Sequence, residues 1–283
     1  MLSDGPLSPR PTGSTRLAAV IGWPVRHSLS PVIYNAAFAS AGVDWTYVAL
    51  PVEPGKGAAA LDSMRTFGLA GLSVTMPHKS DIAAAVDVPS ASVTTLGACN
   101  CVYWSDGVLH GDNTDGDGLV AALETETDVS LNGKTVSVLG TGGAARAIIE
   151  AIGRTGAASI HVWGRRAEAA EAAAALAPIA TTGPLEQVED ADVLINATPV
   201  GMSGGPNPKG IPLPADLISQ HQIVQDIVYE PRETPFMALA RERGARVVGG
   251  VGMLVHQAAR QYTHWVGEPA PIEVMMRAVQ DGE

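Results

Sequence analysis

The chain has few cysteines, few aromatic side chains and little charge. Of its 283 residues, 5% are aromatic, 17% are charged and two are cysteines. Cys99 and Cys101 are two residues apart, a spacing that would point their side chains to opposite faces of a strand. This spacing is unsuited to a CxxC redox or zinc pair, so the cysteine usage favours a reducing, cytoplasmic location.

Two further absences limit the classes of partner. No stretch supplies the roughly 18 uncharged apolar residues of a membrane span, and no basic segment followed by an apolar one begins the chain. We therefore expect neither membrane insertion nor secretion. The 18 Lys and Arg against 29 Asp and Glu give a net charge of −11, which argues against a nucleic-acid partner. Residues 1–16, rich in Pro, Ser and Gly, are predicted to form a disordered tail.

What the chain does contain is a repeated alternation of short apolar runs and alanine-rich segments. The pattern predicts an α/β fold with βαβ units, beginning with a strand "RLAAVIG" and a helix "SPVIYNAAFASAG". "CVYWSDGVLHG" holds two apolar runs around an Asp-Gly pair and predicts a β-hairpin. A second strand-helix array starts at "LNGKTVSVLG", and "GDNTDGDG" before it offers turn chemistry. The sequence therefore predicts two domains.

The second array opens with a glycine loop. "TVSVLGTGGAARAII" places Gly140, Gly142 and Ala145 in the G-x-G-x-x-G/A spacing, after a β-branched strand and before an alanine-rich helix. In that order the glycines allow a tight turn and a close approach to a pyrophosphate, which faces the helix N-terminus. The plain alternative is a simple strand-to-helix turn. The context favours a dinucleotide site.

The next strand indicates which dinucleotide binds. An NAD site usually ends this strand with Asp or Glu, whereas "IHVWGRRAE" presents Arg165 and Arg166. Guanidinium groups bind a 2′-phosphate that a carboxylate would repel, so NADP is favoured over NAD. The alternative is that one arginine lies on a solvated helix start.

Several blocks of sequence together resemble the shikimate dehydrogenase family. They are, with the glycine loop, "HSLSP", "LSVTMPHK", "GACN", "GDNTDGDG", "INATPVGM", "DIVYEP" and "GMLVHQA". The resemblance implies an NADP-dependent enzyme that reversibly reduces 3-dehydroshikimate to shikimate. It also implies a substrate domain over residues 17–114 and 250–283, a Rossmann-like NADP domain over residues 115–249, and a cleft between them.

In that family a lysine and an aspartate form a catalytic pair, and they fall here on Lys79 and Asp115. Oxidation of a ring alcohol needs a group that takes or returns the hydroxyl proton, and no zinc ligand set is apparent. Alone, such a lysine is more often a solvated charge and such an aspartate a turn former or helix cap. A nearby carboxylate keeps a lysine charged, so alcohol oxidation is expected to accelerate toward alkaline pH.

The remaining site residues follow from the resemblance, apart from the glycine loop and the arginines. Ser28 and Ser30 are expected to hold the substrate carboxylate, and Ser30 is also a predicted N-cap with Pro31 at the first helical position. Contacts to the rest of the substrate are expected from Ser73, Thr75, Asn100, Tyr229 and Gln257. The expected cofactor contacts are Gly140, Gly142, Gly143, Ala144, Arg165, Arg166, Thr198 and Gly250.

The chain departs from the family pattern at a few positions. Ser73 stands where asparagine is usual, Cys101 where threonine is frequent and Thr141 where alanine is frequent. Gly164 replaces a common asparagine beside the two arginines, which leaves open a quinate/shikimate dehydrogenase that prefers NAD. A non-catalytic NADP-binding regulator is the alternative from another class, and the presence of both Lys79 and Asp115 argues against it. A homodimer is a candidate assembly.

Overall fold

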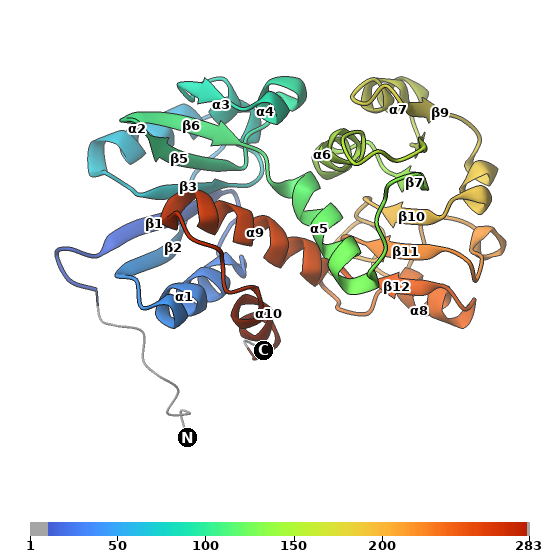
Figure 1. Ribbon diagram of the computed structural model, residues 1–283. Helices are drawn as coiled ribbons and strands as arrows, with labels where there is room; N and C mark the ends of the chain where they lie inside the picture. Colours follow the sequence, from blue (N-terminus) through green and yellow to red (C-terminus); the bar gives the residue numbers. More distant parts are fainter. Residues whose placement is uncertain (1–10, 282–283) are drawn as a thin grey trace. The chain divides into compact units, whose positions relative to one another are not determined.

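The computed structural model describes residues 11–281, which form two compact units (Figure 1). Unit 1 comprises the residues up to Thr114 and those from Ala258 onward, and unit 2 is Asp115–Gln257. The second division falls at Gln257, rather than at residue 249, because α9 (Gly250–Val266) is one continuous helix that contributes to both units. Within residues 11–281 no helix is both long enough and apolar enough to cross a membrane.

The predicted tail extends too far along the chain. Residues 1–10 lie outside the described part, but the residues after them are held in place. The Thr15 hydroxyl donates to Asp44 over 2.7 Å, and β1 begins at Arg16, whose guanidinium lies 4.4 Å from the ring centroid of Trp45. Polar contacts with the start of β2 therefore order the end of the segment that composition alone describes as a tail.

Unit 1 is built on a mixed six-stranded sheet with the order β2-β1-β3-β5-β6-β4. The β2-β1-β3 part is parallel, as the βαβ pattern predicts, but β5 runs antiparallel to both β3 and β6. The predicted hairpin joins β5 to β6, and its Asp106 and Gly107 both have positive φ, at 51° and 79°, as a type I′ turn requires. The strands are β1 (Arg16–Gly22), β2 (Trp45–Pro51), β3 (Gly71–Val74), β4 (Val88–Pro89), β5 (Cys101–Ser105) and β6 (Val108–Asp112).

Local signals explain where the helices of unit 1 begin and end. Gly42 and Gly68 close α1 and α2 in the left-handed conformation, both with φ of 66°. Ser90 caps α4 by accepting a hydrogen bond from the N–H of Val93. The helices are α1 (Ser30–Ala41), α2 (Gly57–Phe67), α3 (Lys79–Ala83), α4 (Ala91–Leu96) and α10 (Ile272–Asp281), with the C-terminal part of α9.

Ser30 is not the N-cap that the sequence predicts. It is already the first residue of α1, and no side chain caps the preceding Leu29. Instead the N–H of Ser30 donates to the hydroxyl of Ser28 over 3.2 Å. The prediction failed because Ser28 supplies the hydroxyl acceptor at the start of α1. Pro31 has no N–H group and therefore needs no acceptor there.

An aromatic cluster joins α1, β2 and the C-terminal part of α9. The rings of Tyr34 and Tyr47 stack with centroids 4.4 Å apart, and Trp265 lies 4.9 Å from Tyr34. A Cβ at Gly71 of β3 would come within 2.5 Å of the Trp265 ring, so glycine makes room for that ring. The C-terminal part of α9 thus belongs to the core of unit 1.

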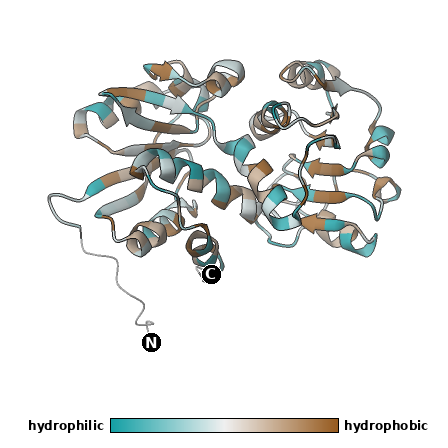
Figure 2. Ribbon diagram, in the orientation of Figure 1, coloured by the Kyte–Doolittle hydropathy of each residue, from teal (hydrophilic) through white to brown (hydrophobic). Residues whose placement is uncertain are grey.

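Unit 2 has a parallel six-stranded sheet with the order β12-β11-β10-β7-β8-β9, and its strands are largely apolar (Figure 2). This is the doubly wound order, with its switch point between β7 and β10. The strands are β7 (Thr135–Leu139), β8 (Ser159–Trp163), β9 (Ala180–Thr182), β10 (Val193–Asn196), β11 (Ile223–Asp226) and β12 (Arg246–Val248). The helices are α5 (Asp115–Thr127), α6 (Gly143–Ile152), α7 (Ala167–Ala174) and α8 (Pro235–Glu242), with the short 3-10 helices η1 (Leu185–Asp190) and η2 (Ala215–Leu217).

The "DGDG" segment begins a helix rather than forming the predicted turn. α5 starts at Asp115, and its two glycines face neighbouring helices. A Cβ at Gly116 would collide with the backbone carbonyl oxygen of Ala147 in α6, and one at Gly118 would lie 2.6 Å from the N–H nitrogen of Gln257 in α9. The glycines are there for close helix packing, which outweighs their low helix propensity.

Candidate active site

The glycine loop connects the end of β7 to α6. Gly140 has φ of 122°, a conformation that favours glycine, and its N–H donates to the carbonyl of Trp163 over 2.8 Å. A Cβ at this position would lie 2.7 Å from the carbonyl oxygen of Ala197. The turn therefore lies between the ends of β8 and β10, at the switch point of the sheet.

The next two glycines face open space. Gly142 precedes the first residue of α6, and a Cβ built on Gly142 or Gly143 meets no atom within 4 Å. Helix geometry leaves the first N–H groups of α6, those around Gly143 and Ala144, without an intrahelical acceptor, and the positive end of the helix dipole adds to their attraction for an anion. Open space beside a helix N-terminus suits the pyrophosphate of a dinucleotide.

Arg165 and Arg166 follow Gly164, the first residue after β8, and both are exposed. Arg166 immediately precedes α7, and β8 pairs with β7 up to Leu139 and Trp163. The arginines thus lie at the same edge of the sheet as the glycine loop. Exposed guanidinium groups at this edge suit the extra phosphate of NADP.

A buried hydrogen-bond network supports the loop that carries Thr198. The Thr198 hydroxyl and N–H both donate to the Asn196 side-chain oxygen, over 2.7 and 3.0 Å. The Asn196 amide in turn donates to Asp226, which also accepts from the hydroxyl of Thr234 and the N–H of Val228. Sequence reasoning quoted the blocks that contain Asn196 and Asp226 but did not select these two residues.

Asp226 is a buried carboxyl group with a perturbed protonation equilibrium. Burial raises its pKa to about 6, although the three donors from Thr234, Val228 and Asn196 oppose that shift. The same network therefore couples the Thr198 loop to a group that can change its charge near pH 6.

Gly250, the first residue of α9, packs against Ile227 and Val228, which directly precede Tyr229. A Cβ on Gly250 would collide with the carbonyl oxygen of Ile227, so the start of α9 packs directly on the residues that follow β11. Tyr229 is half-buried, and burial, aided by the charge of Glu230, raises its pKa. Gln257, also in unit 2, donates from its amide to the carbonyl of Leu254 over 2.9 Å.

In unit 1, Lys79 is the first residue of α3, shortly after β3 ends. It is half-buried, and its carbonyl accepts the N–H of Cys99 over 2.9 Å, which ties it to the segment before β5. Thr75 donates its N–H to Ile21, and its methyl group packs over Gly22, where a Cβ would collide with it. Lys79 and Thr75 therefore lie at the carboxyl ends of β1 and β3, where parallel sheets bind ligands.

Ser73 lies in the interior of unit 1. It is 7% exposed, accepts from the Tyr47 hydroxyl over 2.6 Å and donates to Gln261 over 2.5 Å. The Gln261 oxygen also accepts from the Tyr34 hydroxyl over 3.0 Å. The serine that replaces the usual asparagine is thus part of a network of buried side chains from α1, β2, β3 and α9.

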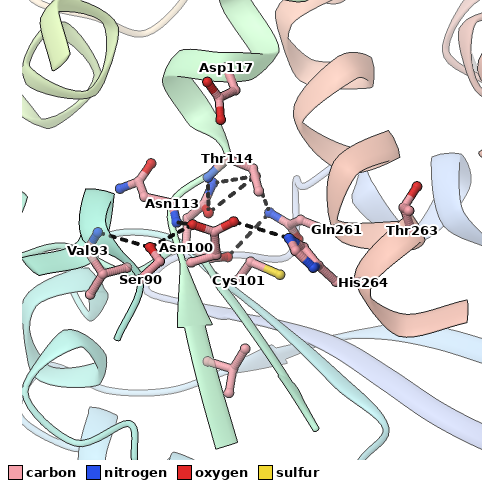
Figure 3. A network of polar contacts seen from close by, with 12 residues as sticks. Ser90, Val93, Asn100, Cys101, Asn113, Thr114, Asp117, Gln261, Thr263 and His264 are labelled. Carbon is pink, nitrogen blue, oxygen red and sulfur yellow. Dashed lines mark hydrogen bonds and ion pairs between the residues drawn. The ribbon is translucent and has the colours of Figure 1, made fainter. Parts of the chain in front are cut away.

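The other end of Gln261 reaches the predicted site residue Asn100 and its hydrogen-bond partner Thr114 (Figure 3). Its amide donates to the Thr114 hydroxyl over 3.1 Å and to the Asn100 carbonyl over 3.4 Å. Asn100, 2% exposed, binds the Thr114 hydroxyl and N–H through its own amide. Gln261 was missed by the sequence analysis, and its position four residues after Gln257 on one helix is the signal that could have found it.

A second polar group surrounds Asp112, and Figure 3 labels three of its members, Ser90, Asn113 and His264. This carboxylate accepts from the Ser90 hydroxyl, from the N–H of Asn113 and from His264 over 3.1 Å. Burial alone would raise the pKa of Asp112, but the hydrogen bonds from His264, Ser90 and Asn113 prevail and lower it to about 2. Two sets of hydrogen bonds therefore hold the residues just before Asp115. Ser90 and His264 bind Asp112, and Asn100 and Gln261 bind Thr114.

The predicted site residues divide between the two units. Unit 1 holds Lys79 with Ser28, Ser30, Ser73, Thr75 and Asn100, and unit 2 holds Asp115, Tyr229, Gln257 and the predicted cofactor contacts. Within residues 11–281, no group of three or more His, Cys, Asp or Glu side chains is arranged to hold a metal ion.

The parallel sheet of unit 2, its glycine loop and its exposed arginine pair define a Rossmann-type dinucleotide-binding protein. Models of the shikimate dehydrogenase substrate-binding domain and of the shikimate 5'-dehydrogenase C-terminal domain match residues 20–102 and 250–280. A shikimate dehydrogenase (NADP(+)) of Moorella thermoacetica is 41% identical over 95% of this chain and 94% of its own. The chain belongs to the shikimate dehydrogenase family.

Two solved structures extend the similarity to the whole fold. Shikimate 5-dehydrogenase from Listeria monocytogenes, in complex with shikimate and NAD, has a TM-score of 0.89 and 31% identity, over 96% of this chain and 99% of its own. The enzyme from Thermus thermophilus, in complex with NADP(H) and shikimate, has a TM-score of 0.88 and 33% identity, over 95% of this chain and all of its own.

Proposed function

We propose that the protein catalyses the NADP-dependent, reversible reduction of 3-dehydroshikimate to shikimate. The observation that carries the proposal is the 41% identity, over 95% of the chain, to a relative named shikimate dehydrogenase (NADP(+)). The glycine loop, the open space over the N-terminus of α6 and the exposed Arg165 and Arg166 support it independently.

In this proposal the residues of unit 2 hold the cofactor. The backbone around Gly140, Gly142, Gly143 and Ala144 binds the pyrophosphate, and Arg165 and Arg166 bind the 2′-phosphate. Thr198 and Gly250 border the remainder of the cofactor. When bound, NADP would supply hydride chemistry at its nicotinamide. Asn196 and Asp226 are positioning residues, because they hold Thr198 through hydrogen bonds.

Lys79 and Asp115 are proposed to handle the proton. The Lys79 ammonium group donates its proton to the carbonyl oxygen during reduction, and the neutral Lys79 amine takes the hydroxyl proton during oxidation. Asp115 orients the lysine and the substrate hydroxyl and favours the charged lysine. Ser28 and Ser30 hold the substrate carboxylate, and Ser73, Thr75, Asn100, Tyr229 and Gln257 complete the substrate site, with Ser73 and Asn100 acting through the network that Gln261 joins.

The experiment is initial-rate oxidation of shikimate with NADP and with NAD, using the wild-type protein and a Lys79→Ala variant. We expect NADP to be preferred, and Lys79→Ala to lower kcat by about 10²- to 10⁴-fold with a small change in KM. Lys56→Ala is the matched control, since Lys56 is exposed and paired with Glu53 in the same unit. A folded wild-type protein without turnover contradicts the reaction, and a Lys79→Ala defect confined to KM contradicts the proton role.

An NAD-preferring quinate/shikimate dehydrogenase is the second candidate. Gly164 favours it, because the family's usual asparagine is missing beside the 2′-phosphate subsite. The Listeria relative whose structure contains shikimate and NAD also supports it. The ratio of kcat/KM for the two cofactors, with shikimate and with quinate as substrates, distinguishes the two candidates.

A cytoplasmic location and a homodimeric assembly complete the proposal. Cys99 and Cys101 are both free and buried, which suits a reducing compartment. Light scattering of the purified protein at several concentrations tests the assembly, with a mass near 58 kDa, twice the 29.1 kDa of the chain, expected for the dimer.

A further inference from the structure

Gly164 and Thr141, two departures from the family pattern, contact each other in unit 2. Thr141 follows Gly140 in the glycine loop, and Gly164 follows β8 and directly precedes Arg165. The two segments are joined by the hydrogen bond from Gly140 to Trp163. The residue pair therefore lies beside both the pyrophosphate loop and the arginine pair.

The side chain of Thr141 occupies the space that a side chain at position 164 would need. A Cβ built on Gly164 would lie 2.5 Å from the Cγ2 of Thr141, 3.6 Å from its Oγ1 and 3.7 Å from the Cβ of Ala170. Carbon atoms do not approach to 2.5 Å, so an asparagine at position 164 is incompatible with Thr141 in this conformation. Gly164 has no positive φ that would require glycine, which leaves the space taken by Thr141 as the physical reason for it.

We infer that Thr141 replaces the missing side chain at position 164 and is a specificity-determining residue for NADP over NAD. Its hydroxyl oxygen lies 3.6 Å from the position that a Cβ on Gly164, the residue before Arg165, would take. In this inference the hydroxyl donates a hydrogen bond to the 2′-phosphate that the arginines bind. A hydroxyl bonded to a charged phosphate contributes more than one bonded to a neutral ribose hydroxyl. The inference rests on the proposed function only in taking NADP as the cofactor.

Two single variants separate the hydroxyl of Thr141 from its methyl group. Thr141→Val keeps the shape and removes the hydroxyl, and we expect it to raise the Kd of NADP about tenfold and that of NAD less than about twofold. Thr141→Ser keeps the hydroxyl and removes Cγ2, and we expect the Kd of NADP to stay within about twofold. Binding is measured by calorimetry, with quenching of the neighbouring Trp163 as a second readout.

The contact itself is tested by adding a Cβ at position 164. Gly164→Ala alone is expected to raise the Kd of NADP about tenfold, because the new Cβ displaces Thr141. In the double variant Thr141→Ser with Gly164→Ala, the displaced atom is absent and the Kd should return to within about threefold of the wild-type value. Thermal unfolding of each variant checks that it is folded, and if Gly164→Ala does not fold, Thr141→Val decides the inference alone.

Two results would overturn the inference. One is a Thr141→Val variant that changes the Kd of NADP and NAD by the same factor. The other is a Gly164→Ala change that weakens NADP binding equally with Thr141 and with Thr141→Ser. Because these are binding measurements, they remain informative if shikimate proves not to be the substrate, and the turnover assay remains informative if Thr141 proves unimportant.

Discussion

The two units hold their site residues by different means. In unit 2 the site is made largely of backbone: a glycine turn with φ of 122°, the N-terminus of α6 and a hydrogen bond between adjacent strand ends. In unit 1 it depends on side chains distant in sequence, since Gln261 in α9 joins Tyr34 in α1, Ser73 in β3 and Thr114 before α5. A backbone site is encoded locally, whereas a side-chain network exists only when the whole unit is folded.

The difference also appears in two fully buried glutamines. Gln261 binds four groups of unit 1 through both ends of its amide. Gln225 in β11 of unit 2 is 0% exposed, and neither of its amide atoms has a hydrogen-bond partner among the described residues. Side-chain hydrogen bonding therefore stabilises the fold at Gln261, whereas the buried amide of Gln225 contributes no hydrogen bond to a described residue.

The largest expected effect comes from substituting these glutamines by leucine. Gln261→Leu removes the hydrogen bonds that the Gln261 amide makes with the Tyr34 and Thr114 hydroxyls. It should lower the unfolding free energy by about 3–5 kcal/mol. Gln225→Leu, the matched control, removes an unbonded amide and should leave stability unchanged or raise it by about 1 kcal/mol. Chemical denaturation measures both. Equal losses in the two variants would contradict the comparison.

The next effect concerns pH and is expected in unit 2. The pKa of Asp226 is about 6 in the folded protein, above the 3.8 of an unperturbed Asp, because of burial. Between about pH 4 and 6 the folded state therefore holds the extra proton, so stability falls as pH rises through this window, by up to about 3 kcal/mol. Asp226→Asn should remove this dependence.

The measurement is the unfolding free energy of Asp226→Asn relative to wild type from pH 4 to pH 7. As pH rises, the unfolding free energy of Asp226→Asn should increase relative to that of the wild type, and the difference should level off above about pH 6. Asp216→Asn is the control, because Asp216 is exposed in η2 of the same unit. A constant difference across the range would show that burial does not perturb this carboxyl.

Gly142→Ala should separate binding from stability. Its φ of −76° is allowed for alanine and its Cβ meets no atom within 4 Å, so the unfolding free energy should change by less than about 0.5 kcal/mol. The same Cβ would stand in the open space beside the N-terminus of α6, where the pyrophosphate is proposed to bind, so the Kd of NADP should rise at least about tenfold, or about 1.4 kcal/mol. Calorimetric titration checks this. Unchanged NADP affinity would show that the backbone of this loop does not approach the cofactor.

The smallest expected effect is at Asp112 in unit 1. Hydrogen bonds from His264, Ser90 and Asn113 overcome burial and bring its pKa to about 2, below the 3.8 of an unperturbed Asp. The stabilisation is therefore present above about pH 4 and lost as pH falls toward 2. Asp112→Asn should cost about 1–2 kcal/mol at pH 7 and less at pH 3, after allowance for partial solvent exposure.

Asp106→Asn is the control for this variant, because Asp106 is exposed in the hairpin turn and asparagine also tolerates its positive φ. Its unfolding free energy should equal that of the wild type at both pH values. A loss in Asp112→Asn that is the same at pH 3 and pH 7 would contradict the role of the charge.

Sequence patterns predicted the elements whose signals are local. The hairpin turn at Asp106 and Gly107 and the loop between β7 and α6 both depend on backbone conformations within a few residues. Prediction failed where a residue had two uses. The glycines at positions 116 and 118 suit a turn, yet they serve helix packing, and Ser30 suits an N-cap, yet Ser28 supplies the acceptor.

By itself the sequence determined the α/β class, the dinucleotide loop and the family, because strand periodicity, glycine spacing and matched blocks are properties of short segments. Only the tertiary structure decided that α9 belongs to both units, that Gln261 bonds to a residue 227 positions away, and that Thr141 fills the space at Gly164. Such contacts depend on where distant side chains come together in the folded chain, and no local pattern specifies that.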